Sequence, residues 1–245
     1  MLATLCNEIH KLFLSGIKGT NRELFNRAYE LSHYFVRHPA TLESLELVFE
    51  LERKLCAGRG PHKQFVEGRV FEALCTSALY CAPDCSDKKC LTENLPLLQK
   101  TTCIEEKQEH MIALKLVDFS REVFQLHIPR DAFNSKRKSL ALELIGKVAV
   151  YYDIPEAYEL CTAALQSKKK SLVLAALEFY EIHWHGQDRS LSPELITQLN
   201  EIISKTKDRS VAVTALNLQV EAGVASELEA LSRIDDWKER NQEWR

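Results

Sequence analysis

Residues that form tight turns are scarce in this chain, and their scarcity limits the folds open to it. The 245 residues include only 8 glycines and 7 prolines. A β-sandwich or β-barrel of this length needs many turns, in which glycine and proline are favoured residues. Since 45% of the residues are hydrophobic, the chain can bury a large core. The composition therefore predicts an all-α fold in which long helices are joined by few, short connections.

Apolar residues recur at three- and four-residue spacing, the period of an amphipathic helix. The first such stripe runs from Leu2 to Phe13 and ends at Gly16, and a long helix in the middle of the chain ends before Pro129. In the second half the expected helices span about 136–151, 155–167, 170–184, 193–205, 209–222 and 225–234. Because short turns separate them, consecutive helices are expected to pair as antiparallel hairpins.

A short pattern recurs in the second half of the chain. Lys138-Ser139, Lys170-Ser171 and Arg209-Ser210 each place a basic residue and a serine before small and branched apolar residues, and the serines are 32 and 39 residues apart. The serines are candidate helix N-caps, and the period is that of a two-helix repeat. Over residues 130–222 the pattern resembles HEAT and armadillo repeats, most closely at Asp208-Arg209-Ser210.

The resemblance implies an α-α superhelix, or solenoid, of about five antiparallel hairpins. We expect one repeat domain over residues 1–245, with an irregular cysteine-containing insertion at 81–103 and a charged cap or tail at 235–245. Trp237 and Trp244 in that last segment either cap the final hairpin or dock onto another chain. The alternative to a solenoid is a compact helical bundle without repeats.

Basic residues are concentrated in the turns inside the expected hairpins. In a stacked array these turns share one edge, so their cations are expected to form a ridge that attracts phosphates or acidic partner segments. The predicted partner-binding residues are Arg59, Lys63, Arg130, Lys136, Arg137, Lys138, Lys168, Lys169, Lys170, Lys205, Lys207 and Arg209. The alternative is structural, because basic residues are also favoured at helix C-termini and keep loops soluble.

Five cysteines, at positions 75, 81, 85, 90 and 103, lie close together in the sequence. The three central cysteines, Cys81, Cys85 and Cys90, could supply three zinc ligands, and Cys75, Cys103 or His110 could supply the fourth. No pair has the two-residue gap of a zinc ribbon or knuckle, so the favoured interpretation is an insertion with exposed, reduced thiols and no metal.

Signatures of catalysis are missing from the sequence. It has no glycine-rich phosphate loop, no zinc-protease motif and no nucleophile elbow. We therefore expect no catalytic residues, no metal and no cofactor.

The net charge of −3 disfavours a generic nucleic-acid-binding protein. No apolar stretch is long enough to cross a membrane and the N-terminus lacks a signal peptide pattern, so we expect a cytoplasmic location. The function expected from these features is a non-catalytic scaffold or adaptor that presents a concave surface and a basic edge to a protein partner. The alternative, which the resemblance leaves open, is a nucleic-acid-binding or DNA-repair protein of the HEAT-like DNA glycosylase type.

Overall fold

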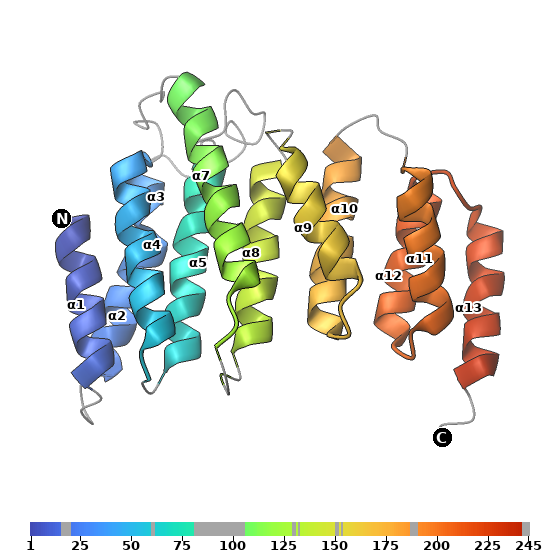
Figure 1. Cartoon of the computed structure of the whole chain (residues 1–245), viewed down its shortest axis with the longest axis horizontal. Coiled ribbons are helices and arrows are strands. Elements are labelled where there is room, and N and C mark those ends of the chain that lie inside the picture. Colours follow the sequence, from blue (N-terminus) through green and yellow to red (C-terminus); the bar gives the residue numbers. More distant parts are fainter. Residues whose placement is uncertain are drawn as a thin grey trace. The chain divides into compact units, whose positions relative to one another are not determined.

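The computed structural model describes residues 1–15, 21–59, 62–80, 106–128, 131, 133–149, 152, 154–186 and 191–241. Every regular element among them is a helix, which confirms the predicted all-α class for this part of the chain (Figure 1). The expected insertion at 81–103 and Trp244 lie outside the described residues. None of the described helices is long and apolar enough to cross a membrane.

The chain divides into two compact units, residues 1–154 and 155–245. The single repeat domain over residues 1–245 stays a prediction. Unit 1 contains helices α1 (Leu2–Ser15), α2 (Asn21–Ser32), α3 (Tyr34–Arg37), α4 (Leu42–Ala57), α5 (Lys63–Tyr80), α7 (Glu106–Gln125) and α8 (Asn134–Ala149). Unit 2 contains α9 (Pro155–Leu165), α10 (Lys170–Gly186), α11 (Pro193–Lys205), α12 (Arg209–Glu221) and α13 (Glu227–Asn241).

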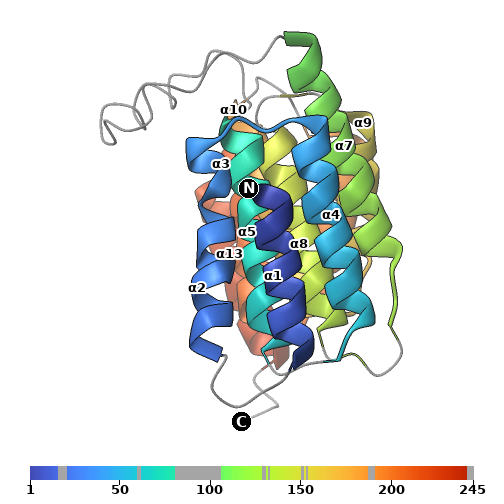
Figure 2. The same cartoon turned by 90° about the vertical axis from the view of Figure 1, so that its left-hand side faces the viewer.

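Unit 1 consists of hairpins that pack side by side in two layers. Helices α1, α4 and α7 form one layer, and α2, α5 and α8 form the other (Figure 2). Each helix directs an apolar stripe between the layers, where Ile9, Leu45, Phe71 and Leu144 are at most 1% exposed. The rings of Phe49 on α4 and Phe119 on α7 stack with centroids 4.2 Å apart. The last residues of α1, α4 and α7 and the first residues of α2, α5 and α8 consequently lie at one end of the unit (Figure 1).

Unit 2 repeats the hairpin arrangement. Helices α9 and α10 form one hairpin, α11 and α12 the next, with contacts between α9 and α11 and between α10 and α12. Helix α13 packs on α12 and continues to Asn241, beyond the predicted end at 234. Trp237 explains the extension, because its ring is buried and its indole Nε1 donates a hydrogen bond to the Thr206 carbonyl over 2.8 Å.

The serines of the repeated pattern do not cap the helices as predicted. Ser139 lies inside α8 and donates to the Ser135 carbonyl, one turn earlier. At α12 the cap is Asp208, whose carboxylate accepts hydrogen bonds from the amides of Ser210 and Val211. A carboxylate both accepts these bonds and interacts favourably with the helix dipole, so Asp208 takes the position that the pattern assigned to serine.

Candidate functional site

Three of the cations predicted to lie at the edge of unit 1 are partly or fully buried in it. Arg137 is only 1% exposed, so the prediction that it contacts a partner is corrected. Lys63 is largely buried, and Lys138 is half-buried with its Nζ 5.2 Å from the centroid of the Phe124 ring. Arg59 and Lys136 are exposed, and Arg130 lies outside the described residues. The described residues of unit 1 therefore do not form the continuous basic ridge that the sequence predicted.

Arg137 belongs to a buried charge network, which is formed by α4, α5, α8 and the turn before α8. Its Nη2 donates to both carboxylate oxygens of Glu67, at 2.8 and 3.0 Å, and to Oδ2 of Asp131 at 2.8 Å. Its Nε lies 3.5 Å from Oε1 of Glu52, which is itself 1% exposed. Lys63 joins the network through Asp131, at 3.2 Å, and donates to the carbonyls of Cys56 and Gly58.

The network balances its charge by keeping one carboxyl neutral. Two cations, Arg137 and Lys63, face three carboxyls. Hydrogen bonds from Arg137 and Lys63 lower the pKa of Asp131 to about 2, overcoming the opposing effect of burial. Burial and the nearby Glu67 instead raise the pKa of Glu52 to about 8. Burial also raises the pKa of Glu67, although the hydrogen bonds from Arg137 oppose the shift. We therefore assign the proton that the network holds at neutral pH to Glu52, which leaves the network close to electrically neutral.

Glu52, Cys56 and Glu67 could in principle bind a metal ion, since their ligand atoms lie within 4.8 Å of one another. However, the Cys56 thiol donates to Oε1 of Glu52 over 3.1 Å, and burial raises the pKa of this thiol, which disfavours the thiolate that a metal needs. The Arg137 guanidinium already provides the positive charge beside Glu67. The arrangement is that of a structural ion-pair network.

The predicted cysteine cluster falls mostly outside the described residues, which include only Cys75 of its five members. Burial raises the pKa of the Cys75 thiol to about 12. Its sulfur is therefore a protonated thiol at neutral pH.

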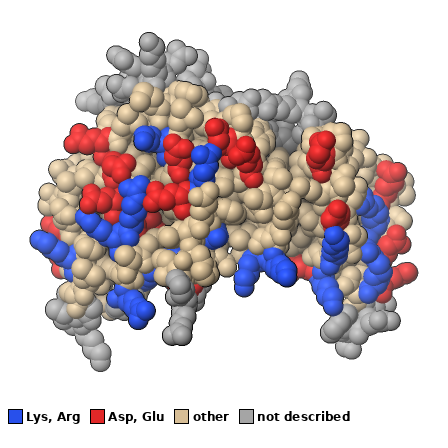
Figure 3. All heavy atoms as spheres, in the orientation of Figure 1, with Lys and Arg blue, Asp and Glu red and all other residues tan. Residues whose placement is uncertain are grey.

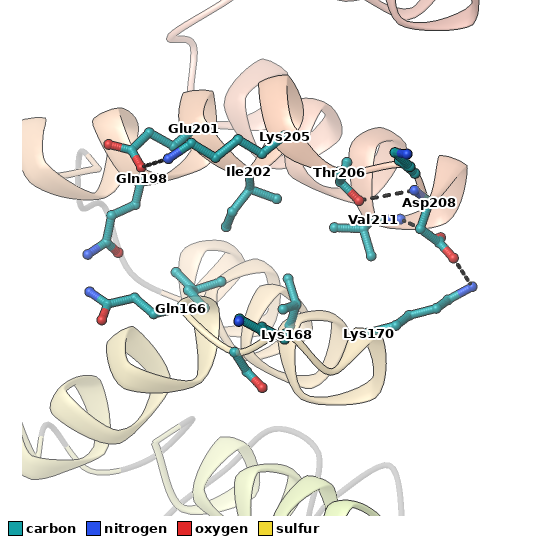
Figure 4. Close-up of a pocket in the computed structure, with 14 residues that line it drawn as sticks. Gln166, Lys168, Lys170, Gln198, Glu201, Ile202, Lys205, Thr206, Asp208 and Val211 are labelled. Carbon is teal, nitrogen blue, oxygen red and sulfur yellow. Dashed lines mark hydrogen bonds and ion pairs between the residues drawn. The ribbon is translucent and has the colours of Figure 1, made fainter. Parts of the chain in front are cut away.

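The predicted cations of unit 2 converge on a groove between its two hairpins. This cavity, which we call the lysine groove, has a volume of about 750 Å³ (Figure 4). Its described lining residues are Leu165, Gln166, Ser167, Lys168, Lys170, Val173, Gln198, Glu201, Ile202, Lys205, Thr206, Lys207, Asp208 and Val211. Lys169 and Arg209, also predicted to contact a partner, are exposed in or beside the same two turns.

Local hydrogen bonds hold the two turns that carry the lysines. In the α9–α10 turn, Ser167 Oγ accepts from the Lys169 amide over 3.1 Å. In the α11–α12 turn, Thr206 Oγ1 accepts from the Asp208 amide, while its carbonyl accepts from Trp237. Trp237 thus anchors the turn that precedes α12, consistent with a capping role in the last hairpin.

Two ion pairs occupy part of the lysine groove. Lys170 contacts Asp208 across the groove at 2.7 Å, and Lys205 contacts Glu201 on its own helix at 2.8 Å (Figure 4). The pairing with Lys170 and the hydrogen bond from Ser210 lower the pKa of Asp208 to about 2. With four lysines against two carboxylates along its lining, the groove keeps a net positive charge. Figure 3 shows Lys and Arg gathered over this end of unit 2, with acidic side chains interspersed.

Sequence reasoning found the lysines of the groove and missed two of its other features. Leu165, Val173, Ile202 and Val211 form an apolar floor, contributed by four different helices. Gln198 lines one end of the groove, where its amide faces that of Gln166 (Figure 4). The oxygen Oε1 of Gln198 is shielded from solvent and accepts no hydrogen bond from the described residues.

We compared the chain with protein-family models, with curated proteins and with solved structures, and none of the three comparisons found a match. The geometry of the lysine groove is therefore the basis for a proposed function.

Proposed function

We propose that this protein is a non-catalytic scaffold or adaptor that binds a protein partner at the lysine groove of unit 2. The observation that carries the proposal is the convergence of Lys168, Lys170, Lys205 and Lys207 from two neighbouring hairpin turns on one concave surface. A basic cavity of this kind attracts acidic groups although the whole chain is slightly acidic. Lys169 and Arg209, in and beside the same turns, extend the basic edge around it.

The hairpin architecture supports this proposal. Arrays of the HEAT and armadillo kind stack helix pairs so that equivalent helices of successive hairpins lie in the same layer. The two layers of unit 1, and the contacts of α9 with α11 and of α10 with α12 in unit 2, are the packing expected of such hairpins. Repeat arrays use extended concave surfaces for binding and supply no reaction chemistry of their own.

The chemistry of the groove favours a protein partner over nucleic acid. Enzymes that act on a flipped base stack it between aromatic or apolar side chains in a deep pocket. The described residues that line the lysine groove include no aromatic side chain, and they include Glu201 and Asp208, whose charges repel phosphates. A protein segment can instead offer both carboxylates to the lysines and apolar side chains to the floor.

Capture from the native source tests the proposal. The groove variant combines Lys168→Glu with Lys205→Glu, and the control variant combines Lys11→Glu with Lys115→Glu, two exposed lysines of unit 1. Both change the net charge equally. We expect the wild-type chain and the control to retain the same proteins after nuclease treatment, and the groove variant to lose most of them. Thermal unfolding followed by circular dichroism checks that both variants fold.

Two results would overturn the proposal. If the groove variant retains the same proteins in the same amounts as the control, the lysine groove does not bind a partner. If nuclease treatment releases everything that the groove retains, the ligand is a nucleic acid, as the alternative from the sequence holds.

A further inference from the structure

The size of the lysine groove limits what can occupy it, provided that the proposed function holds. Its volume of about 750 Å³ lies within the range of about 300–1,000 Å³ that is typical of ligand pockets. A pocket of this size encloses a short segment and does not match the flat face of a folded domain, which needs a much larger surface.

The floor of the groove is aliphatic. Leu165 ends α9, while Val173, Ile202 and Val211 come from α10, α11 and α12. Ile202 and Val211 point into the cavity from α11 and α12, and Lys168, Lys170 and Lys205, which we call the rim, lie around it (Figure 4). A ligand made only of charged groups would leave this floor without a partner, whereas an aliphatic side chain would bury apolar area against it.

Gln198 adds a requirement for a hydrogen-bond donor. Its Oε1 is buried at the end of the groove and accepts no hydrogen bond from the described residues, although the Gln166 amide faces it. Buried carbonyl oxygens normally accept a hydrogen bond. An ionised carboxylate is an acceptor only, so it cannot satisfy this oxygen. A backbone N–H of a bound peptide can do so once the Gln198 side chain rotates toward the groove, because the oxygen has no exposed surface in the unbound chain.

The ion pairs of the rim can exchange partners at little cost. Lys170–Asp208 and Lys205–Glu201 are both solvent-exposed, with lysine side chains 54% and 74% exposed. Exposed pairs contribute little to stability. When an incoming carboxylate pairs with Lys170, Asp208 still accepts hydrogen bonds from the amides of Ser210 and Val211. Binding would therefore leave the cap of α12 in place.

We propose that the lysine groove binds a short acidic peptide segment in which carboxylate side chains flank one aliphatic side chain. The aliphatic side chain rests on the floor, a backbone N–H of the segment donates to Gln198 Oε1, and the carboxylates pair with lysines of the rim. Each of the three contacts corresponds to one feature of the groove, so each can be removed separately.

Fluorescence anisotropy with the full chain and labelled synthetic peptides tests the three contacts. The reference probe has one leucine between two pairs of glutamates. In the second probe serine replaces the leucine, and in the third glutamines replace the glutamates. We expect the reference probe to bind most tightly, with affinity that falls as salt rises, and each altered probe to bind at least about tenfold more weakly.

Variants of the chain complete the test. Gln198→Met removes the acceptor while keeping a side chain of similar size. Because one hydrogen bond is lost, we expect the affinity for the reference probe to fall about threefold to tenfold. Lys168→Glu with Lys205→Glu is expected to weaken it by more, while Lys11→Glu with Lys115→Glu leaves the affinity unchanged. Unfolding curves of each variant show that the fold is kept.

The outcomes separate this inference from the proposed function. Equal binding of the leucine and serine probes, or complete competition by inorganic phosphate at equal concentration, would show a site for anions alone and overturn the inference. If no probe binds while capture from the native source still depends on the groove lysines, the inference fails and the proposed function stands. If capture is also independent of those lysines, both fail.

Discussion

Replacing Arg137 with methionine should lower the free energy of unfolding of unit 1 by about 3–5 kcal/mol. The guanidinium is almost fully buried and donates to Glu67 and Asp131. Without it, the Glu67 carboxylate loses its principal counter-charge and is left in a region of low polarity, where an unpaired charge is strongly unfavourable. Methionine fills part of the vacated volume, so the loss reports mainly on the charge.

The positions of the tryptophans allow this effect to be assigned to unit 1. All three tryptophans of the chain, Trp184, Trp237 and Trp244, lie within residues 155–245. Urea unfolding followed by tryptophan fluorescence therefore reports on unit 2, while circular dichroism reports on the helices of both units. We expect Arg137→Met to shift part of the dichroism transition to lower urea and to leave the fluorescence transition in place.

Arg53→Met provides the matched control. Arg53 also contacts two carboxylates, Glu46 and Glu122, at 2.8 Å each, but these side chains are exposed. Its loss should cost less than about 1 kcal/mol. Equal shifts for Arg53→Met and Arg137→Met would show that burial of the network adds nothing to the cost of removing its arginine, and would contradict this prediction.

The second large effect is expected for Glu52→Gln, which should stabilise unit 1 at alkaline pH. The pKa of Glu52 is raised from 4.5 to about 8 by burial and by Glu67. Between these values the folded state holds a proton that the unfolded state has lost, so stability falls as pH rises. The slope is about 1.4 kcal/mol per pH unit for one proton. The stability that the proton on Glu52 contributes is complete below about pH 4.5 and lost by about pH 8.

Glutamine keeps the shape of the protonated carboxyl and cannot ionise. Its side-chain oxygen can still accept the hydrogen bond from Cys56. We therefore expect similar stability for variant and wild type near pH 5, and a growing advantage for the variant up to pH 8. Urea midpoints measured by circular dichroism across this range test the expectation. Glu50→Gln, an exposed neighbour on α4 paired with Lys54, should leave the slope unchanged. Parallel curves for Glu52→Gln and the wild type would mean that Glu52 is ionised in the fold.

The helices could be predicted from the sequence because their apolar stripes are local patterns. Predicted and observed boundaries agree within two residues for α8, α9, α11 and α12, where proline or a clear change of periodicity marks the helix ends. The end of α13 could not be predicted, since its extension depends on the contact of Trp237 with Thr206, which lies 31 residues away. The HEAT or armadillo relationship and the solenoid arrangement remain predictions.

The buried network could not be derived from the same patterns. A basic residue near a hairpin turn looks the same in the sequence whether it faces solvent or the core. Arg137 is buried because Glu67, 70 residues earlier, meets it across the α5–α8 contact. One local signal was available: Glu52 lies four residues after Val48 and three before Leu55, on the apolar stripe of α4. A carboxyl at such a position indicates a buried partner.

The lysine groove was predictable in part. Its cations lie in short turns that the hairpin pattern identified, and their convergence follows from the pairing of neighbouring hairpins. The floor and the buried oxygen of Gln198 depend on how four helices meet, which no local pattern specifies.

Site-specific crosslinking in the native source tests the central claim, that the lysine groove contacts a protein partner, most directly. A photoreactive amino acid is placed at Lys168 on the rim or, as a control, at exposed Lys115 in unit 1. Irradiation is predicted to join position 168 to a small set of proteins, through peptides rich in acidic residues beside an aliphatic one, and position 115 to none of them. Equal adducts at both positions, or none at position 168, would contradict the claim.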